Sequence, residues 1–427
     1  MLINSFYMKK MLNKPFLLFL PFLFLYVFII VFVHKNIMQG DESRYYMYAN
    51  NLIHGFYSPK GEVYLWNGPG YPIILMPFVA LKLPLIFITL LNAVFQYLSV
   101  VLLYKTFIKY VSPAKALLFS LFWACYYISF KEMGLLYTES FTVFLVAAFQ
   151  YFTVLVFKQA KRKYIIISGV LLGYIILTKV IFGYVVLTLL AINFIIFLFL
   201  RKDNLKKTCF ILIIALLSNL PYLFYTYSLT GKLFYWANSG GSSLYWASSP
   251  FEGEYGDWNN DDFNTYCNID TLIPCNASII AKNHENDFKI FRQYTGVEKD
   301  MMFKKKAIEN IKNHPAKYVK NYISNFGRML FGIPQSFFYQ RFQNLMRIPP
   351  NAVIFTFLLF SGTITILRFR RIRYEILFLV MLSFIYLAGS ATLSSDQRQF
   401  YIVVPVILFW TANIFQQFIS ININREL

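Results

Sequence analysis

Ten apolar runs recur along the chain, and this pattern constrains the fold more than any other feature. They lie near residues 15–34, 84–104, 115–132, 136–157, 164–178, 180–200, 208–228, 350–367, 374–392 and 400–420. A helix of about 20 apolar residues crosses the ~30 Å hydrocarbon core of a bilayer. A soluble protein of 427 residues, 58% of them hydrophobic, could not bury so much apolar surface. We therefore expect an all-α, polytopic membrane protein with about ten transmembrane helices.

The basic residues alternate between the two sides of these predicted spans. Nineteen cations fall in every second connection and at the two chain ends, against seven in the alternate short connections. The positive-inside rule places the richer set in the cytoplasm, so both termini are expected inside. The richer set comprises Lys9, Lys10, Lys14, Lys105, Lys109, Lys115, Lys158, Lys161, Arg162, Lys163, Arg201, Lys202, Lys206, Lys207, Arg368, Arg370, Arg371, Arg373 and Arg425. The net charge of +20 thus follows topology, and we expect no nucleic-acid partner.

This topology divides the chain into three regions. Residues 1–228 form an N-terminal transmembrane core with a first outward loop over 34–83, residues 229–349 form a second large outward loop, and residues 350–427 form the C-terminal helices. The first run has no small-residue cleavage site after it, so it is interpreted as a retained anchor. In the first loop, 43–53 is expected to form a helix on the membrane surface, and the following stretch to be rich in turns. In the second loop, His314-Pro315 is expected to interrupt a helix.

The most informative motif is Gly40-Asp41-Glu42-Ser43-Arg44-Tyr45, a few residues beyond the first span. Two carboxylates and a guanidinium at the membrane–water boundary suit a sugar donor carried on a lipid phosphate. A carboxylate can accept the proton of an attacking hydroxyl as general base. An arginine can bind a leaving phosphate through paired hydrogen bonds. From the residues alone, a solvated charged turn that anchors the helix end is the favoured explanation of the motif.

The sequence from Gly40 to Phe78 resembles the first outer loop of the GT-C superfamily of glycosyltransferases. The likeness is strongest to the bacterial branch related to protein O-mannosyltransferases and the aminoarabinose transferase of lipid A. Further segments resemble this family in the same order: LLYTESF, GVLLGYIILTK, LPYLFYTYSLTGKLF and SSDQRQFYIVVPVILF. Two departures occur in the third segment, where Pro221-Tyr222 replaces Pro-Trp and Thr226-Tyr227 replaces Arg-Asn, so one phosphate contact of the family is missing.

The resemblance implies roles for individual residues. Asp41 matches the position of the catalytic base, and Glu42 or Glu139 would orient the acceptor. A second group would bind the donor and its phosphate: Arg44, Tyr45, Lys179 and Arg398. Simpler interpretations remain for some of them. Glu139 fits a helix N-terminal cap, and Lys179 and Arg398 fit cations that extend to the interface. Lys131 and Glu132 are interpreted as a local ion pair.

The resemblance implies that the chain moves a sugar from a polyprenyl-phosphate donor to a glycan, lipid or protein acceptor, with inversion, at the outer face of a bacterial inner membrane. No cofactor is expected, and the four histidines have no metal-ligand spacing. Two other functions stay open: an oligosaccharide polymerase or ligase, and a flippase or transporter of lipid-linked sugars. The sugar and the acceptor are not specified. Cys267 and Cys275 lie eight residues apart in the second loop, where a disulfide is one possibility.

Overall fold

The computed structural model describes residues 12–38, 40–59, 61–259, 277–336 and 345–418, and every regular element in those ranges is a helix. The helices are α2 (Pro15–Leu18), α3 (Leu20–Val33), α4 (Asp41–Ile53), α5 (Gly70–Ala80), α6 (Leu85–Phe107), α7 (Pro113–Ala124), α8 (Tyr127–Glu132), α9 (Glu139–Gln159), α10 (Arg162–Thr178), α11 (Ile181–Leu200), α12 (Asp203–Leu217), α13 (Leu220–Thr230), α14 (Gly240–Ala247), α15 (Ala277–Phe291), α16 (Gly296–Asn313), α17 (Pro315–Phe331), α19 (Ile348–Leu367), the 3₁₀ turn η1 (Phe369–Arg371), α20 (Tyr374–Ala391) and α21 (Gln397–Phe418). The predicted all-α class is confirmed.

Each predicted apolar run forms one helix or two consecutive helices. Six single helices of the described residues are long and apolar enough to cross a membrane, namely α6, α9, α11, α19, α20 and α21. The pair α12 and α13, bent by 47°, makes a seventh. This bend precedes Pro221, which a helix accepts only in its first turn. The first run is divided into α2 and α3, and the third into α7 and α8. The chain is thus a multi-pass membrane protein.

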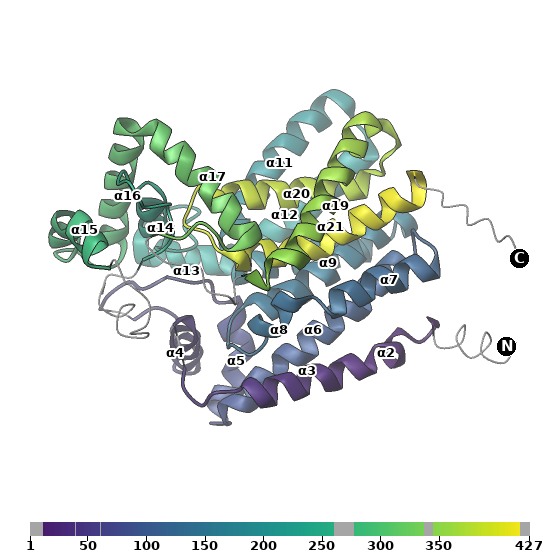
Figure 1. Ribbon diagram of the computed structural model, residues 1–427, viewed down its shortest axis with the longest axis horizontal. Coiled ribbons are helices and arrows are strands. Elements are labelled where there is room, and N and C mark those ends of the chain that lie inside the picture. The colour runs from purple at the N-terminus through teal and green to yellow at the C-terminus, as the bar shows by residue number, and fades with distance from the viewer. Residues whose placement is uncertain (1–11, 39, 60, 260–276, 337–344, 419–427) are drawn as a thin grey trace, which may run out of the picture.

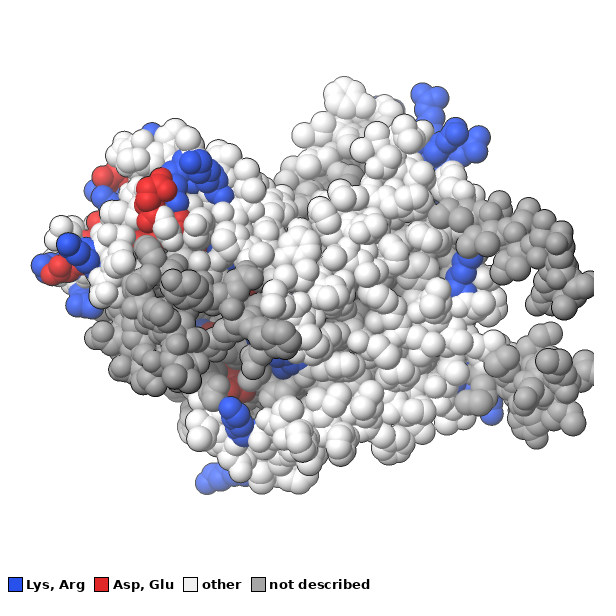
Figure 2. All heavy atoms as spheres, in the orientation of Figure 1, with Lys and Arg blue, Asp and Glu red and all other residues white. Residues whose placement is uncertain are grey.

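The two large loops and the two ends of the bundle lie at opposite poles. Helix α4 and helices α14 to α17 gather at one pole, while the start of α2 and the end of α21 lie at the other (Figure 1). The start of α2 and the end of α21 therefore lie on the same side of the bundle. On the face drawn in Figure 2, Lys, Arg, Asp and Glu side chains gather at the poles and the surface between them is uncharged. Such a belt is what a bilayer requires.

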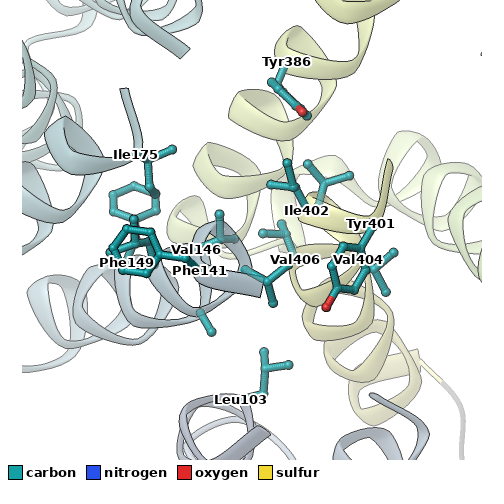
Figure 3. Packing of buried hydrophobic residues seen from close by; sticks show 14 of the residues in the cluster. Leu103, Phe141, Val146, Phe149, Ile175, Tyr386, Tyr401, Ile402, Val404 and Val406 are labelled. Carbon is teal, nitrogen blue, oxygen red and sulfur yellow. The ribbon is translucent and has the colours of Figure 1, made fainter. Parts of the chain in front are cut away.

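Helices α9 and α21 form the centre of the bundle. Most of their residues are buried, whereas α19 and α11 direct most of theirs outward. Every residue from Phe400 to Ile414 is buried, as expected for a helix that is apolar on all sides. Figure 3 shows Phe141, Val146 and Phe149 of α9 packed towards Ile402 and Val406 of α21. The two helices that begin at the loop pole with Glu139 and Gln397 are therefore held rigidly by the core.

The first outer loop contains more helix than the sequence predicted. The expected helix exists as α4, but its first residue is Asp41, and one of its faces packs on α5. The stretch expected to be turns is partly the helix α5. Pro72 lies in the first turn of α5, where the missing N–H is harmless. An added Cβ at Gly70 would lie 2.5 Å from the Thr178 hydroxyl, so glycine lets this loop approach the end of α10.

The second outer loop has a small hydrophobic core of its own. Tyr245 and Trp246 of α14 pack with Phe288 and Phe291 of α15 and Phe303 of α16. The predicted interruption at His314-Pro315 is confirmed, because α16 ends at Asn313 and α17 begins at Pro315. The loop is therefore a folded cap on the membrane bundle. Cys267 and Cys275 lie outside the described residues.

Candidate active site

The site begins at the turn that leads from α3 into α4. Gly40 has a φ of +58°, a left-handed conformation that favours glycine. An added Cβ there would lie 2.9 Å from the hydroxyl of Tyr137, so the turn also lies close to the connection before α9. Asp41 and Glu42 follow in the first turn of α4, where the helix dipole favours carboxylates. Local backbone geometry thus fixes where the Asp41 carboxylate points.

Asp41 is held between two arginines from distant parts of the chain. Its Oδ1 accepts a hydrogen bond from Nη2 of Arg44, one turn along α4. Its Oδ2 lies 3.2 Å from Nη1 of Arg398, in the first turn of α21. Burial alone would raise the pKa of Asp41, but the Arg398 and Arg44 guanidiniums outweigh burial, and the net pKa is lowered. The carboxylate is therefore ionised and charge-neutralised in this state.

Each arginine also lies over an aromatic ring. The Arg44 guanidinium carbon is 5.2 Å from the centre of the Trp66 ring, and its Nη1 is 3.4 Å from the Tyr64 hydroxyl. The Arg398 guanidinium carbon is 5.0 Å from the Tyr137 ring. Contacts of this kind stabilise a cation in a partly desolvated position. Both guanidiniums are thus oriented around Asp41 without being fully enclosed.

A second ion pair lies beside the first. Glu139 opens α9 and Lys179 closes α10, and their Oε1 and Nζ atoms are 2.7 Å apart. The Glu139 side chain is 1% exposed and the Lys179 side chain 21% exposed. Lys179 also acts electrostatically on Asp41, and Glu139 acts on Arg398. Four helix ends therefore converge on one cluster of charges.

Glu42 and Tyr45 are placed differently from the other predicted site residues. The Glu42 Oε1 accepts a hydrogen bond of 2.6 Å from the backbone N–H of Leu136, which joins α4 to the segment carrying Tyr137. Tyr45 is 3% exposed, packs edge-on against Tyr71 and accepts a hydrogen bond from Asn67. In this structure both side chains support the wall of the site.

Sequence reasoning missed several neighbours of this cluster. Tyr64, Trp66 and Tyr137, which contact the arginines, are common aromatic residues in a chain where 20% of residues are aromatic, so composition gave no signal. Glu132 interacts with Glu139 and Arg398 as well as with its predicted partner Lys131. Among the described residues, Glu132 Oε2 is a buried oxygen without a hydrogen-bond partner. A glutamate at the end of an apolar run is the signal that could have identified it.

The arrangement can bind an anion and remove a proton. Arg44, Lys179 and Arg398 provide three cations, of which Arg398 also lies at the positive end of the α21 dipole. Asp41 provides an ionised carboxylate among them. Within the described parts of the chain, no group of three His, Cys, Asp or Glu residues could hold a metal ion.

Comparisons with known proteins place this site in context. Residues 69–225 match the family described as dolichyl-phosphate-mannose-protein mannosyltransferase. This range includes Glu139 and Lys179 and leaves out Asp41, Arg44 and Arg398. No curated protein matches the sequence.

Three solved structures are reported as similar to this chain. The oligosaccharyltransferase of Archaeoglobus fulgidus in the apo form has a TM-score of 0.51 at 15% identity, over 93% of this chain and 50% of that chain. The oligosaccharyltransferase AglB of the same organism, in complex with an inhibitory peptide and a dolichol-phosphate, has a TM-score of 0.48 at 14% identity, over 93% and 50%. ArnT from Cupriavidus metallidurans, bound to undecaprenyl phosphate, has a TM-score of 0.41 at 13% identity, over 93% and 77%.

The chain spans about half the length of the archaeal oligosaccharyltransferases. The likeness to the apo form shows a shared fold. Together with the family match, it supports the resemblance to membrane glycosyltransferases of the GT-C superfamily.

Proposed function

We propose that the chain is a membrane glycosyltransferase that moves a sugar from a polyprenyl-phosphate donor to a hydroxyl of a cell-envelope acceptor. The observation that carries this proposal is the ionised Asp41 held between Arg44 and Arg398. The family match over residues 69–225 supports a lipid-phosphate donor. The acceptor is a glycan, a lipid or a protein, and the site is proposed to face outward from a bacterial inner membrane.

In the proposed reaction the phosphate of the donor binds to Arg44, Arg398 and Lys179. An anion that attracts the two guanidiniums weakens their hold on Asp41, so the carboxylate becomes more basic when the donor is bound. The acceptor oxygen then forms a bond to the anomeric carbon, and the bond from that carbon to the phosphate oxygen breaks. The electron pair leaves on the lipid phosphate, and the hydroxyl proton passes to Asp41. Attack from the face opposite the phosphate inverts the anomeric configuration.

This order of events gives the two arginines a double role. Before the donor binds, they neutralise a partly buried carboxylate that would otherwise be costly at this depth. After it binds, they stabilise the negative charge that develops on the leaving phosphate.

A transfer assay with purified protein in nanodiscs would test the proposal. A panel of radiolabelled polyprenyl-phosphate sugars would be supplied with an envelope extract as acceptor. Arg44→Gln and Arg398→Gln should raise the donor KM, because each removes one cation from the phosphate. Lys289→Gln serves as control, since Lys289 is exposed and, within the described ranges, pairs with exposed Glu285. Release of intact lipid-linked sugar on the opposite side of a vesicle, with no transfer, would instead support the flippase alternative.

A further inference from the structure

One face of α17 is a row of polar side chains directed at backbone carbonyls. Tyr318 donates to Thr392 O at 3.0 Å, and Asn325 donates to Ala391 O at 3.0 Å and Leu393 O at 2.8 Å. The last carbonyls of a helix have no partner within that helix. The cap helix α17 therefore satisfies the end of α20 and the turn that follows it.

Arg328 ends this row and is the most enclosed cation described in the cap. It is 2% exposed, and its Nε donates to Ser395 O at 2.8 Å. Its two terminal nitrogens donate to Pro334 O at 2.5 Å and Tyr255 O at 3.0 Å. One guanidinium thus joins three separate segments by their backbones, and Asp257 is the nearest anion, at 3.7 Å.

The segment that Arg328 holds is the one that presents Arg398. Ser395 lies three residues before Arg398. The next residue, Asp396, caps α21: its Oδ1 accepts from Gln397 N at 2.6 Å, and its own N–H donates to Gln399 Oε1 at 2.9 Å. Since Arg398 is in the first turn of α21, a shift of this start would move the guanidinium away from Asp41.

We propose that Arg328 is a positioning residue that fixes Arg398 for donor binding, and that through it the second outer loop is coupled to the phosphate site. The inference rests on the proposed role of Arg398. Arg328 itself does not contact the ion-pair cluster: its described partners are three carbonyls, the Asn325 side chain and Asp257. Lysine cannot reproduce these contacts, because its donors all lie on one nitrogen, whereas the guanidinium spreads them over three nitrogens in a planar fork.

A double-mutant cycle on binding of undecaprenyl phosphate to the full chain tests this coupling. Arg328→Gln should weaken binding by about 5- to 20-fold, as expected when a charge-assisted contact is misplaced. Arg328→Lys should not restore it. The double variant Arg328→Gln with Arg398→Gln should bind no more weakly than Arg398→Gln alone, because both changes remove the same interaction. Additive losses would overturn the proposal.

Asn321→Ala provides the matched control on the same helix. Asn321 is also buried, and its amide donates to Ala247 O and Ser249 O, away from the turn before α21. It should lower the melting temperature without weakening lipid-phosphate binding. An equal loss of binding in Asn321→Ala would reduce the role of Arg328 to general stability.

Hydrogen exchange separates this inference from the proposed function. Arg328→Gln should speed exchange in peptides covering 391–399, and Asn321→Ala should not. Unchanged exchange in Arg328→Gln would overturn the positioning role even if binding fell. If Arg398→Gln bound undecaprenyl phosphate like the wild type, the phosphate contact of Arg398 would be wrong, and the exchange result would still decide whether Arg328 fixes the turn.

Discussion

Replacing Lys179 with methionine should destabilise the protein by leaving Glu139 without its partner. The Glu139 side chain is 1% exposed, and its remaining polar contact among the described residues is the Thr138 hydroxyl at 3.5 Å. Breaking a buried ion pair by removing one partner costs about 3–5 kcal/mol. We therefore expect a loss of about 3–5 kcal/mol in the free energy of unfolding at pH 7.

A matched exposed ion pair gives the control for this prediction. Unfolding would be followed by SDS titration in mixed micelles at pH 7. The pair of Lys207 and Asp203 has the same 2.7 Å separation, but Asp203 is 72% exposed, so Lys207→Met should change stability by less than about 1 kcal/mol. Adding Glu139→Gln to Lys179→Met should recover most of the loss. A loss in Lys179→Met no larger than that in Lys207→Met would refute the reasoning.

Three further predictions concern the cluster and the topology. Arg398→Gln should move the acid limb of the pH–rate profile to higher pH, because Asp41 loses the stronger of the two arginine interactions that lower its pKa. An unmoved limb would contradict the role of Asp41 as the ionised base. Gly40→Ala should destabilise by about 1–2 kcal/mol, since φ is +58° and Tyr137 leaves no room for a Cβ, as thermal unfolding would show; an unchanged melting temperature would argue against this turn. Cysteine labelling should find Asp41 outside and Lys161 and Arg370 inside, and the reverse accessibility would invert the topology.

Much of the fold could be predicted because hydrophobic length is a strong signal. Runs such as 85–107 and 181–200 have few alternatives to a membrane helix. Helix α5 was not predicted, because the prolines and glycines of this stretch were interpreted as turn signals. Pro72 nevertheless lies in the first turn of α5, where a helix accepts proline. The hydrophobic core inside the cap was not predicted, because it depends on contacts between α14, α15 and α16 that no local pattern reveals.

The site was predicted in part for a similar reason. Charged residues at span ends are rare enough to stand out, and Asp41, Arg44, Glu139, Lys179 and Arg398 do converge. Their pairing could not be read from spacing, because Asp41 and Arg398 are separated by 357 positions. The supporting places of Glu42 and Tyr45, and the hold of Arg328 on the start of α21, depend on packing between distant segments.

The most direct test of the central claim is the rate of sugar transfer by Asp41→Asn. Asparagine keeps the size of the side chain and removes its basicity, and a positioned base typically contributes about 10²–10⁴-fold. We predict a loss of about 10²-fold or more in the transfer rate, with binding of undecaprenyl phosphate largely kept. Transfer at the wild-type rate by Asp41→Asn, while Glu139→Gln is inactive, would make Glu139 the base. Full activity in Asp41→Asn, Glu139→Gln and Glu42→Gln alike would contradict the account.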